Sequence, residues 1–199
     1  MLTLFHAPQS RSTRILWLLE EIGTPYAIRH VGIRYADGSG TGPDPANMHP
    51  DKKVPALLHD GTLLTESTAI ALHLCETFPQ AGLAPAPGDA DRGAFLSAMC
   101  WADNEFGMNL YMRRAGMTDP RTVANLGMAQ RRFLEALARG PYMLGERFSA
   151  VDVMIGFAVL FVREHLSADE RIDTYAARLR ARPAVARALA KDAIPAVAA

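Results

Sequence analysis

A valine–proline pair, Val54-Pro55, lies between a polar loop and the apolar triplet at residues 56–58. Asp60-Gly61 follows as a tight-turn signal, because this dipeptide readily adopts the positive φ that short hairpins require. Residues 62–64 then form the returning strand, and a helical pattern begins at Glu66-Ser67. A proline entering a strand opposite a hairpin and a helix start predicts a cis Val54–Pro55 peptide bond.

This arrangement predicts two kinds of polar group facing one ligand. A cis bond exposes the backbone N–H and C=O of Val54 to an extended peptide. A helix beginning at Ser67 offers free N–H groups and the positive end of its dipole to a carboxylate. Together they predict a binding site for a small anionic peptide.

The residues before the hairpin alternate between strand and helix patterns. Leu2–Phe5 is a short predicted strand, apolar residues recur at helical spacing from Ser12 until Gly23, and Tyr26–Val31 is a second strand. A strand–helix–strand unit of this length predicts a parallel pair with a right-handed crossover. With the hairpin and its following helix, the order resembles the α/β thioredoxin-like arrangement, a mixed four-stranded sheet with helices.

A linker rich in Pro, Gly and Ala at residues 79–87 is the clearest domain boundary. It separates residues 1–78 from residues 88–199, where every segment has helical periodicity. Ser149 and Asp152 predict a capped helix, Val151–Val162, whose apolar surface favours the centre of an all-α bundle. Residues 32–45 are expected to form a flap beside the site, followed by a short helix near Ala46–Met48.

Composition excludes several classes of partner. Lys+Arg and Asp+Glu both number 21, so no net charge attracts nucleic acid or an anionic membrane. The longest apolar run, residues 153–162, is too short for a bilayer, and no basic leader precedes the first strand. A cytoplasmic protein is expected. Cys75 and Cys100 lack metal-ligand spacing and are expected to be buried free thiols. Three histidines near the site are expected to be ordinary surface or turn residues: His6, His49 and His59.

Lys53-Val54-Pro55, the hairpin and residues 66–70 (Glu-Ser-Thr-Ala-Ile) together resemble the glutathione-binding half of the soluble glutathione transferases. The resemblance implies a thioredoxin-like N-terminal domain, an all-helical C-terminal domain, and glutathione as a substrate without a metal. It also implies a homodimer, which the small size of the N-terminal domain favours. The same fold hosts several reactions, so the motif does not by itself fix the chemistry.

The resemblance also implies roles for individual residues in glutathione binding. The hydroxyl and N–H of Ser67 would take the γ-glutamyl carboxylate and Glu66 the ammonium group, whereas Lys53 would pair with the glycyl carboxylate. Lys52 stands where the family commonly has glycine, which leaves open which lysine faces the site. Arg11 is expected to touch the ligand or a partner subunit.

The family activates glutathione by stabilising its thiolate through a Tyr, Ser or Cys after the first strand. Phe5 and His6 stand where tyrosine-type members carry their Tyr, and Ser10 matches the serine-type position, four residues before Arg14. Ser10 is therefore the predicted catalytic residue. Ser12 is the rival, with capping of the first helix as its alternative role. Three aromatic residues of the helical domain are candidates for an apolar co-substrate pocket or for the core: Trp101, Phe106 and Tyr111.

The leading functional hypothesis is an enzyme that conjugates glutathione to a small, largely apolar electrophile. A glutathione-binding stress or adaptor protein without turnover is the alternative from a different class, and a glutathione-dependent isomerase or dehalogenase is another. A disulfide reductase is disfavoured, because no cysteine precedes residue 75 and the first loop carries serines only.

Overall fold

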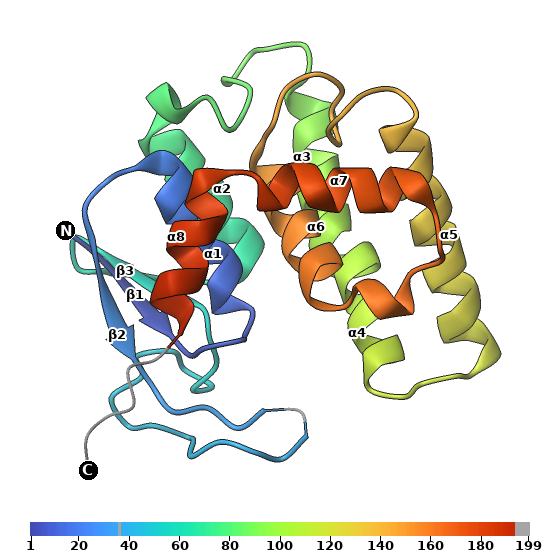
Figure 1. The fold of residues 1–199 in the computed structure, drawn as a ribbon. Helices are drawn as coiled ribbons and strands as arrows, with labels where there is room; N and C mark the ends of the chain where they lie inside the picture. The colour runs from blue at the N-terminus through green and yellow to red at the C-terminus, as the bar shows by residue number, and fades with distance from the viewer. Residues whose placement is uncertain (36, 194–199) are drawn as a thin grey trace. The chain divides into compact units, whose positions relative to one another are not determined.

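The computed structural model describes residues 1–35 and 37–193, which form two compact units (Figure 1). The first unit contains Met1–Ala81 together with the C-terminal helix α8 (Pro183–Asp192), and the second is Gly82–Arg182. This division differs from the expected one at the C-terminus. Helix α8 packs against α1 (Ser12–Ile22) of the first unit, using small buried residues such as Ala184 and Ala188 that permit close approach.

The first unit is built on a four-stranded mixed sheet of order β2-β1-β3-β4. Its strands are β1 (Leu2–His6), β2 (Tyr26–His30), β3 (Ala56–His59) and β4 (Thr62–Thr65). Strand β1 is parallel to β2 and antiparallel to β3, and β3 and β4 form the predicted hairpin. This confirms the thioredoxin-like fold.

Two helices pack against each other and against this sheet. Helix α1 contacts β1 and ends at Gly23, whose φ of 75° is easily reached without a side chain. Helix α2 (Ser67–Thr77) contacts the hairpin and is followed by a short 3-10 turn, Pro79–Ala81. The helix starts thus fall where the sequence predicts them, directly beside the ends of β1 and β4.

The loop between β2 and β3 holds neither helix nor strand over residues 32–35 and 37–55. The expected short helix at residues 46–48 is wrong. The Asp44 side chain accepts from Ala46 N–H over 2.8 Å, and its backbone oxygen accepts from Asn47 N–H over 3.1 Å. These two bonds would also suit the start of a helix, but His49 N–H then donates to Asn47 Oδ1 over 3.0 Å, so a side-chain acceptor takes the N–H that would continue the helix.

The second unit is helical, as expected. It contains α3 (Arg92–Trp101), a π-helical stretch η2 (Ala102–Gly107), α4 (Met108–Arg114), α5 (Pro120–Leu137), α6 (Ala150–Phe161), a short 3-10 helix η3 (Arg163–His165) and α7 (Glu170–Arg180). Helix α6 is buried over residues 150–159 and contacts η2, α3 and α7. It is therefore the central helix of this unit, as its apolar sequence predicts.

Asp152 forms the predicted capping box with Ser149 and also joins two further segments. Its carboxylate accepts from Ser149 N–H over 2.9 Å, from Met143 N–H over 2.8 Å and from the Tyr175 hydroxyl over 3.1 Å. Burial raises the pKa of Asp152 to about 6, against the opposing effect of these donors. One buried side chain thus holds the N-terminus of α6, the preceding loop and α7 together.

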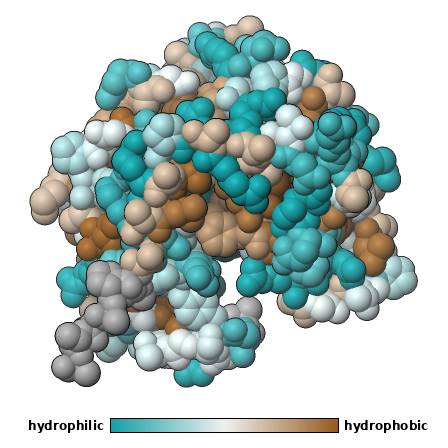
Figure 2. Space-filling model, viewed as in Figure 1, coloured by the Kyte–Doolittle hydropathy of each residue, from teal (hydrophilic) through white to brown (hydrophobic). Residues whose placement is uncertain are grey.

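The prediction that Cys75 and Cys100 are both buried is confirmed only for Cys75. Neither cysteine is in a disulfide, but Cys75 is buried whereas Cys100 is exposed on α3. Within residues 1–35 and 37–193, no three or more His, Cys, Asp or Glu side chains are placed to hold a metal ion. Across the same described residues, no helix has the length and apolarity needed to cross a membrane. Hydrophilic residues cover much of the face shown in Figure 2.

We predict that Asp152→Ala lowers the free energy of unfolding by about 3 kcal/mol, because several buried donors lose their acceptor at once. The matched control is Asp119→Ala at the exposed N-terminus of α5, where Asp119 also accepts from two backbone N–H groups. That change should cost only about 1 kcal/mol. Urea denaturation measures both, and equal losses would contradict a special role for Asp152.

Candidate functional site

Ser10 lies in the loop between β1 and α1, and its side chain is partly exposed. Its Oγ donates to Ala7 O over 2.6 Å and accepts from Ser12 N–H over 3.2 Å. The hydroxyl group that satisfies a free N–H at the start of α1 is therefore that of Ser10. Its Oγ also lies 2.8 Å from Ser12 Oγ, so the two hydroxyl groups form a hydrogen-bonded pair.

Ser12 does not cap α1, contrary to the capping interpretation, because its side chain turns away from the helix start. Its Oγ lies 2.7 Å from His6 Nδ1 and 3.1 Å from Ala7 O. Ser12 is fully buried. A group without exposed surface does not touch a ligand, so the structure leaves Ser10 as the serine of this loop that is placed for direct contact.

The sequence predicted that His6 is a surface or turn residue, and this prediction is wrong. His6 is completely buried at the end of β1. Its Nε2 lies 3.2 Å from Asp192 Oδ1, an ion-pair distance whose angle is poor for a hydrogen bond. Asp192 is the last residue of α8, and sequence reasoning did not identify it. The structure therefore places a histidine–carboxylate pair directly behind the serine loop.

Asp192 has two further hydrogen-bond partners, one in the loop after β1 and one in the first turn of α1. Its carboxylate accepts from Thr13 Oγ1 over 2.5 Å and from Gln9 N–H over 3.2 Å. Burial alone would raise the pKa of Asp192, but interactions with His6, Thr13 and Gln9 outweigh burial and hold that pKa below its usual value. Asp192 is consequently an ionised carboxylate at neutral pH.

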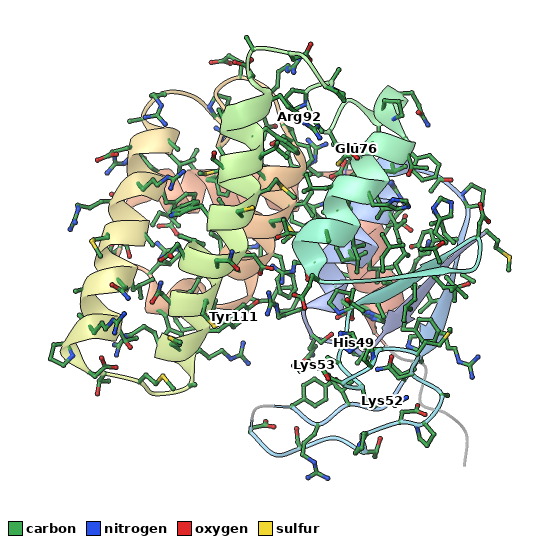
Figure 3. All side chains as sticks on the ribbon, turned by 180° about the vertical axis from the view of Figure 1, so that it is seen from behind. His49, Lys52, Lys53, Glu76, Arg92 and Tyr111 are labelled. Atoms are coloured by element: carbon green, nitrogen blue, oxygen red, sulfur yellow. The ribbon has the colours of Figure 1, made fainter. Side chains whose placement is uncertain are left out.

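The Val54–Pro55 peptide bond is cis, which confirms the prediction. The two lysines before it differ in their surroundings (Figure 3). Lys52 Nζ donates to Asn47 O over 2.7 Å and is thereby held within its own loop. The side chain of Lys53 is 73% exposed and has only a 3.4 Å contact with Asp51. Lys53 is thus the lysine with freedom to reach a ligand.

Asn47 is a second residue that sequence reasoning missed. It is fully buried, and its Nδ2 donates to Lys53 O over 3.0 Å while its Oδ1 accepts from His49 N–H over 3.0 Å. His49 is also buried, contrary to expectation, and its Nδ1 accepts from Asp51 N–H. These side chains fix the irregular backbone that leads into the cis proline, because buried backbone polar groups need partners.

Glu66 and Ser67 occupy the start of α2. Glu66 has a φ of 66° and a ψ of 119°, a conformation that residues with a side chain rarely adopt. Its side chain is exposed, whereas Ser67 is buried as the first residue of the helix. Helix α2 therefore begins directly after β4, and the first N–H groups of any helix have no acceptor within the helix itself. Such a position suits a carboxylate.

The remaining candidates fall into two groups. Arg11 is partly exposed in the serine loop. In the helical unit Phe106 is fully buried between Trp101 and Phe133, with ring centroids 5.6 and 5.1 Å away. Trp101 is buried as well, so the core interpretation holds for both. Tyr111 on α4 is partly exposed and keeps its place as a candidate for the co-substrate pocket.

His59, the third histidine, does lie beside the turn of the hairpin and is partly buried. Its Nδ1 is 2.8 Å from His73 Nε2, a contact that joins β3 to α2. Burial and the neighbouring His59 lower the pKa of His73. This pair is a structural contact of the hairpin, at the opposite end of β3 from Pro55.

Comparison with known proteins finds relatives of the N-terminal part of the chain and of most of its length. Residues 1–76 match the family described as glutathione S-transferase, N-terminal domain. Glutathione S-transferase 3 of Schizosaccharomyces pombe is 28% identical over 192 residues, covering 84% of this chain and 77% of the relative. A stretch of 60 residues is 38% identical to protein LigF of a Sphingobium species, covering 30% of this chain and 23% of that protein.

Solved structures extend the likeness over nearly the whole chain. A sphingomonad glutathione S-transferase complexed with glutathione has a TM-score of 0.81 at 27% identity, with 97% of this chain and 100% of that chain covered. A theta class glutathione S-transferase from Xanthomonas axonopodis pv. citri, with glutathione bound, has a TM-score of 0.74 at 27% identity, with 94% and 96% covered. A glutathione transferase from Methylococcus capsulatus, at 24% identity and a TM-score of 0.82 over 96% and 98%, shares the fold.

Proposed function

We propose that this chain is a soluble glutathione S-transferase, which binds glutathione and transfers its sulfur to a small, largely apolar electrophile; the match of residues 1–76 and the likeness to glutathione S-transferases over nearly the whole chain support this. The observation that carries the proposal is Ser10, a partly exposed hydroxyl beside the start of α1. It acts in the same compact unit as the cis Val54–Pro55 bond and the start of α2. The glutathione bound in the sphingomonad relative supports the choice of ligand.

Glutathione carries a charged group at each end, and the unit offers a partner for each. Ser67 and the N–H groups at the start of α2 receive the γ-glutamyl carboxylate, and the exposed carboxylate of Glu66 receives the ammonium group. The exposed Lys53 pairs with the glycyl carboxylate. The backbone of Val54 hydrogen-bonds the middle of the peptide, and Arg11 stands beside it in the serine loop.

Ser10 would then stabilise the glutathione thiolate. A free thiol has a pKa of about 8.5, so only about 3% of it is ionised at pH 7. Lowering that pKa by about two units raises the reactive fraction roughly 25-fold, which corresponds to about 2.7 kcal/mol. A hydrogen bond to a charged sulfur is worth about 1.5–3 kcal/mol, so one hydroxyl supplies much of this difference.

We predict that Ser67→Ala and Glu66→Gln each weaken glutathione binding about ten- to a hundredfold, through loss of a charge-assisted hydrogen bond worth about 1.5–3 kcal/mol. Titration calorimetry measures the dissociation constants. Ser97→Ala, an exposed serine within α3, is the matched control and should bind like the wild type. Wild-type affinity in both site variants would return these residues to a plain role in starting α2.

We predict that Ser10→Ala still binds glutathione, because the peptide is held by other residues. Its bound thiol should titrate at higher pH, and turnover with a good electrophile should fall about tenfold or more. Ultraviolet absorbance of the thiolate against pH gives the first quantity, and initial rates give the second. Ser10→Thr keeps a hydroxyl and should retain part of both. An unshifted thiol titration in Ser10→Ala would remove Ser10 from the mechanism.

The same experiments distinguish transfer from the other functions. Tight glutathione binding without turnover across a panel of electrophiles would identify a binding or adaptor protein. Release of halide, or isomerisation without net consumption of glutathione, would identify the dehalogenase or isomerase alternative. In each case Ser67→Ala should still weaken binding, because the three functions share the peptide site.

We further propose that the protein works in the cytoplasm as a homodimer, as its family membership favours. Sedimentation velocity at about micromolar concentration should therefore report about twice the mass of one chain. A single species with the mass of one chain, unchanged by raising the concentration, would contradict the dimer.

A further inference from the structure

Three short contacts lead from the partly exposed Ser10 to a buried carboxylate. Ser10 Oγ lies 2.8 Å from Ser12 Oγ, Ser12 Oγ lies 2.7 Å from His6 Nδ1, and His6 Nε2 lies 3.2 Å from Asp192 Oδ1. Beyond Ser10 the path is closed to solvent, because Ser12 and His6 are fully buried and the Asp192 side chain is 7% exposed. We call these four residues the serine–histidine chain.

The positions of the hydrogen atoms along the serine–histidine chain follow from the chemistry of Asp192 at its buried end. His6 Nε2 lies 3.2 Å from the Asp192 carboxylate, and an N–H facing a negative charge is favoured over a lone pair facing it, so we place the hydrogen of the neutral His6 ring on Nε2 and leave Nδ1 as an acceptor. The Ser12 hydroxyl then donates its single hydrogen to Nδ1. Ser10 in turn donates to Ser12 Oγ or to Ala7 O, which lies 2.6 Å away. While His6 is neutral, every hydroxyl hydrogen of the chain therefore points inward.

A proton on His6 Nδ1 reverses the direction in which the hydrogen bonds of the chain donate. Nδ1–H donates to Ser12 Oγ, and the Ser12 hydrogen turns to Ser10 Oγ. The hydrogen of Ser10 is then free to point outward. The chain thus has two hydrogen-bond states. In the state with His6 protonated, Ser10 keeps its bond to Ser12 as an acceptor while its own hydrogen turns outward, so donation to an external anion gives up only the bond to Ala7 O.

We infer that His6, paired with Asp192, accepts the proton that bound glutathione gives up, passed through Ser10 and Ser12. The inference rests on the proposed role of Ser10. In the transfer the S–H bond breaks and an O–H bond forms at Ser10, whose own hydrogen moves to Ser12. The hydrogen of Ser12 moves to His6 Nδ1. One proton has crossed the chain, and the products are a thiolate that accepts from Ser10 and an imidazolium beside Asp192.

The surroundings of His6 favour this acceptor. A positive ring next to the Asp192 carboxylate in a buried site gains more Coulomb energy than the same pair would gain in water. The other titratable ring against His6 is His30 of β2, with centroids 5.6 Å apart. Burial and the neighbouring His6 lower the pKa of His30, which keeps that ring neutral. Tyr35 also lies in the field of Asp192, and both burial and that charge raise its pKa, so it adds no charge.

The spatial series Ser12, His6 and Asp192 also resembles the Ser–His–Asp triad that activates the nucleophile of a hydrolase. The burial of Ser12 argues against that use. A nucleophilic oxygen must reach a substrate carbonyl, whereas Ser12 Oγ is enclosed by His6, Ala7 and Ser10. The arrangement instead suits proton transfer inward, from the partly exposed hydroxyl of Ser10 through Ser12 to His6.

The destination of the proton is measurable. Glutathione binding is followed by titration calorimetry near pH 7 in two buffers with different ionisation enthalpies, and thiolate formation by ultraviolet absorbance. If His6 keeps the proton, the wild-type protein forms thiolate but releases fewer than about half a proton per thiolate to the solvent. Release of a full proton per thiolate would overturn the inference while leaving the proposed function intact. Absence of glutathione binding would overturn both.

Variants locate the acceptor. His6→Gln and Asp192→Asn should still bind glutathione but show about threefold less thiolate at pH 7, as expected when the thiol pKa rises by about one unit from about 6.5. Any thiolate they form should release its proton to solvent. Thr13→Val is the matched control, because it removes another hydrogen bond to Asp192 and leaves the chain intact. His30→Gln controls for loss of a neighbouring imidazole. Both controls should keep the wild-type proton release.

A direct readout covers the case in which the His6 variants do not fold. Histidine labelled with ¹⁵N distinguishes the neutral Nε2–H form from the doubly protonated ring in the intact protein. His6 should be neutral without glutathione and protonated at both nitrogens when glutathione is bound. A His6 ring that stays neutral in a complex containing thiolate contradicts the inference.

Discussion

The Asp192 carboxylate holds together the loop on which the proposed chemistry depends. It comes from the end of α8 and reaches the N–H of Gln9, the hydroxyl of Thr13 and the ring of His6. A buried charge is costly unless it is paired and hydrogen-bonded, so this carboxylate favours the one loop conformation that supplies all of its partners. The loop that carries Ser10 is thereby tied to α8, most directly through the N–H of the preceding residue, Gln9.

Buried polar side chains recur wherever the chain must be held in an irregular conformation. Asn47 fixes the backbone before the cis Val54–Pro55 bond, and Asp152 fixes the start of α6 and the loop before it. In each case a side chain supplies the partner that regular secondary structure would have provided. The proposed binding surface for glutathione is thus built largely from loops, but these loops are held by buried hydrogen bonds.

The proposed site separates two tasks. Residues around the cis bond and the start of α2 hold the peptide by its charges, and the loop after β1 acts on the sulfur. Stabilising a thiolate requires a donor for the sulfur and also a place for the departing proton. In our proposal the serine–histidine chain meets both requirements, because the proton taken up by His6 would free the Ser10 hydroxyl to turn outward.

The sequence by itself determined the parts of this protein that depend on local pattern. Helical spacing, the Asp60-Gly61 turn and the Val54-Pro55 pair predicted the sheet, the hairpin, the cis bond and the capped helix α6. Local pattern failed where a side chain competes with it, as at Asn47, whose Oδ1 accepts from His49 N–H in place of a helical backbone acceptor. The tertiary structure alone decided the rest. Asp192 meets Gln9 across 183 positions of sequence, and no local periodicity encodes such a contact. For the same reason only the fold shows that α8 packs on α1, that His6 is buried, and that Ser12 faces inward while Ser10 faces out.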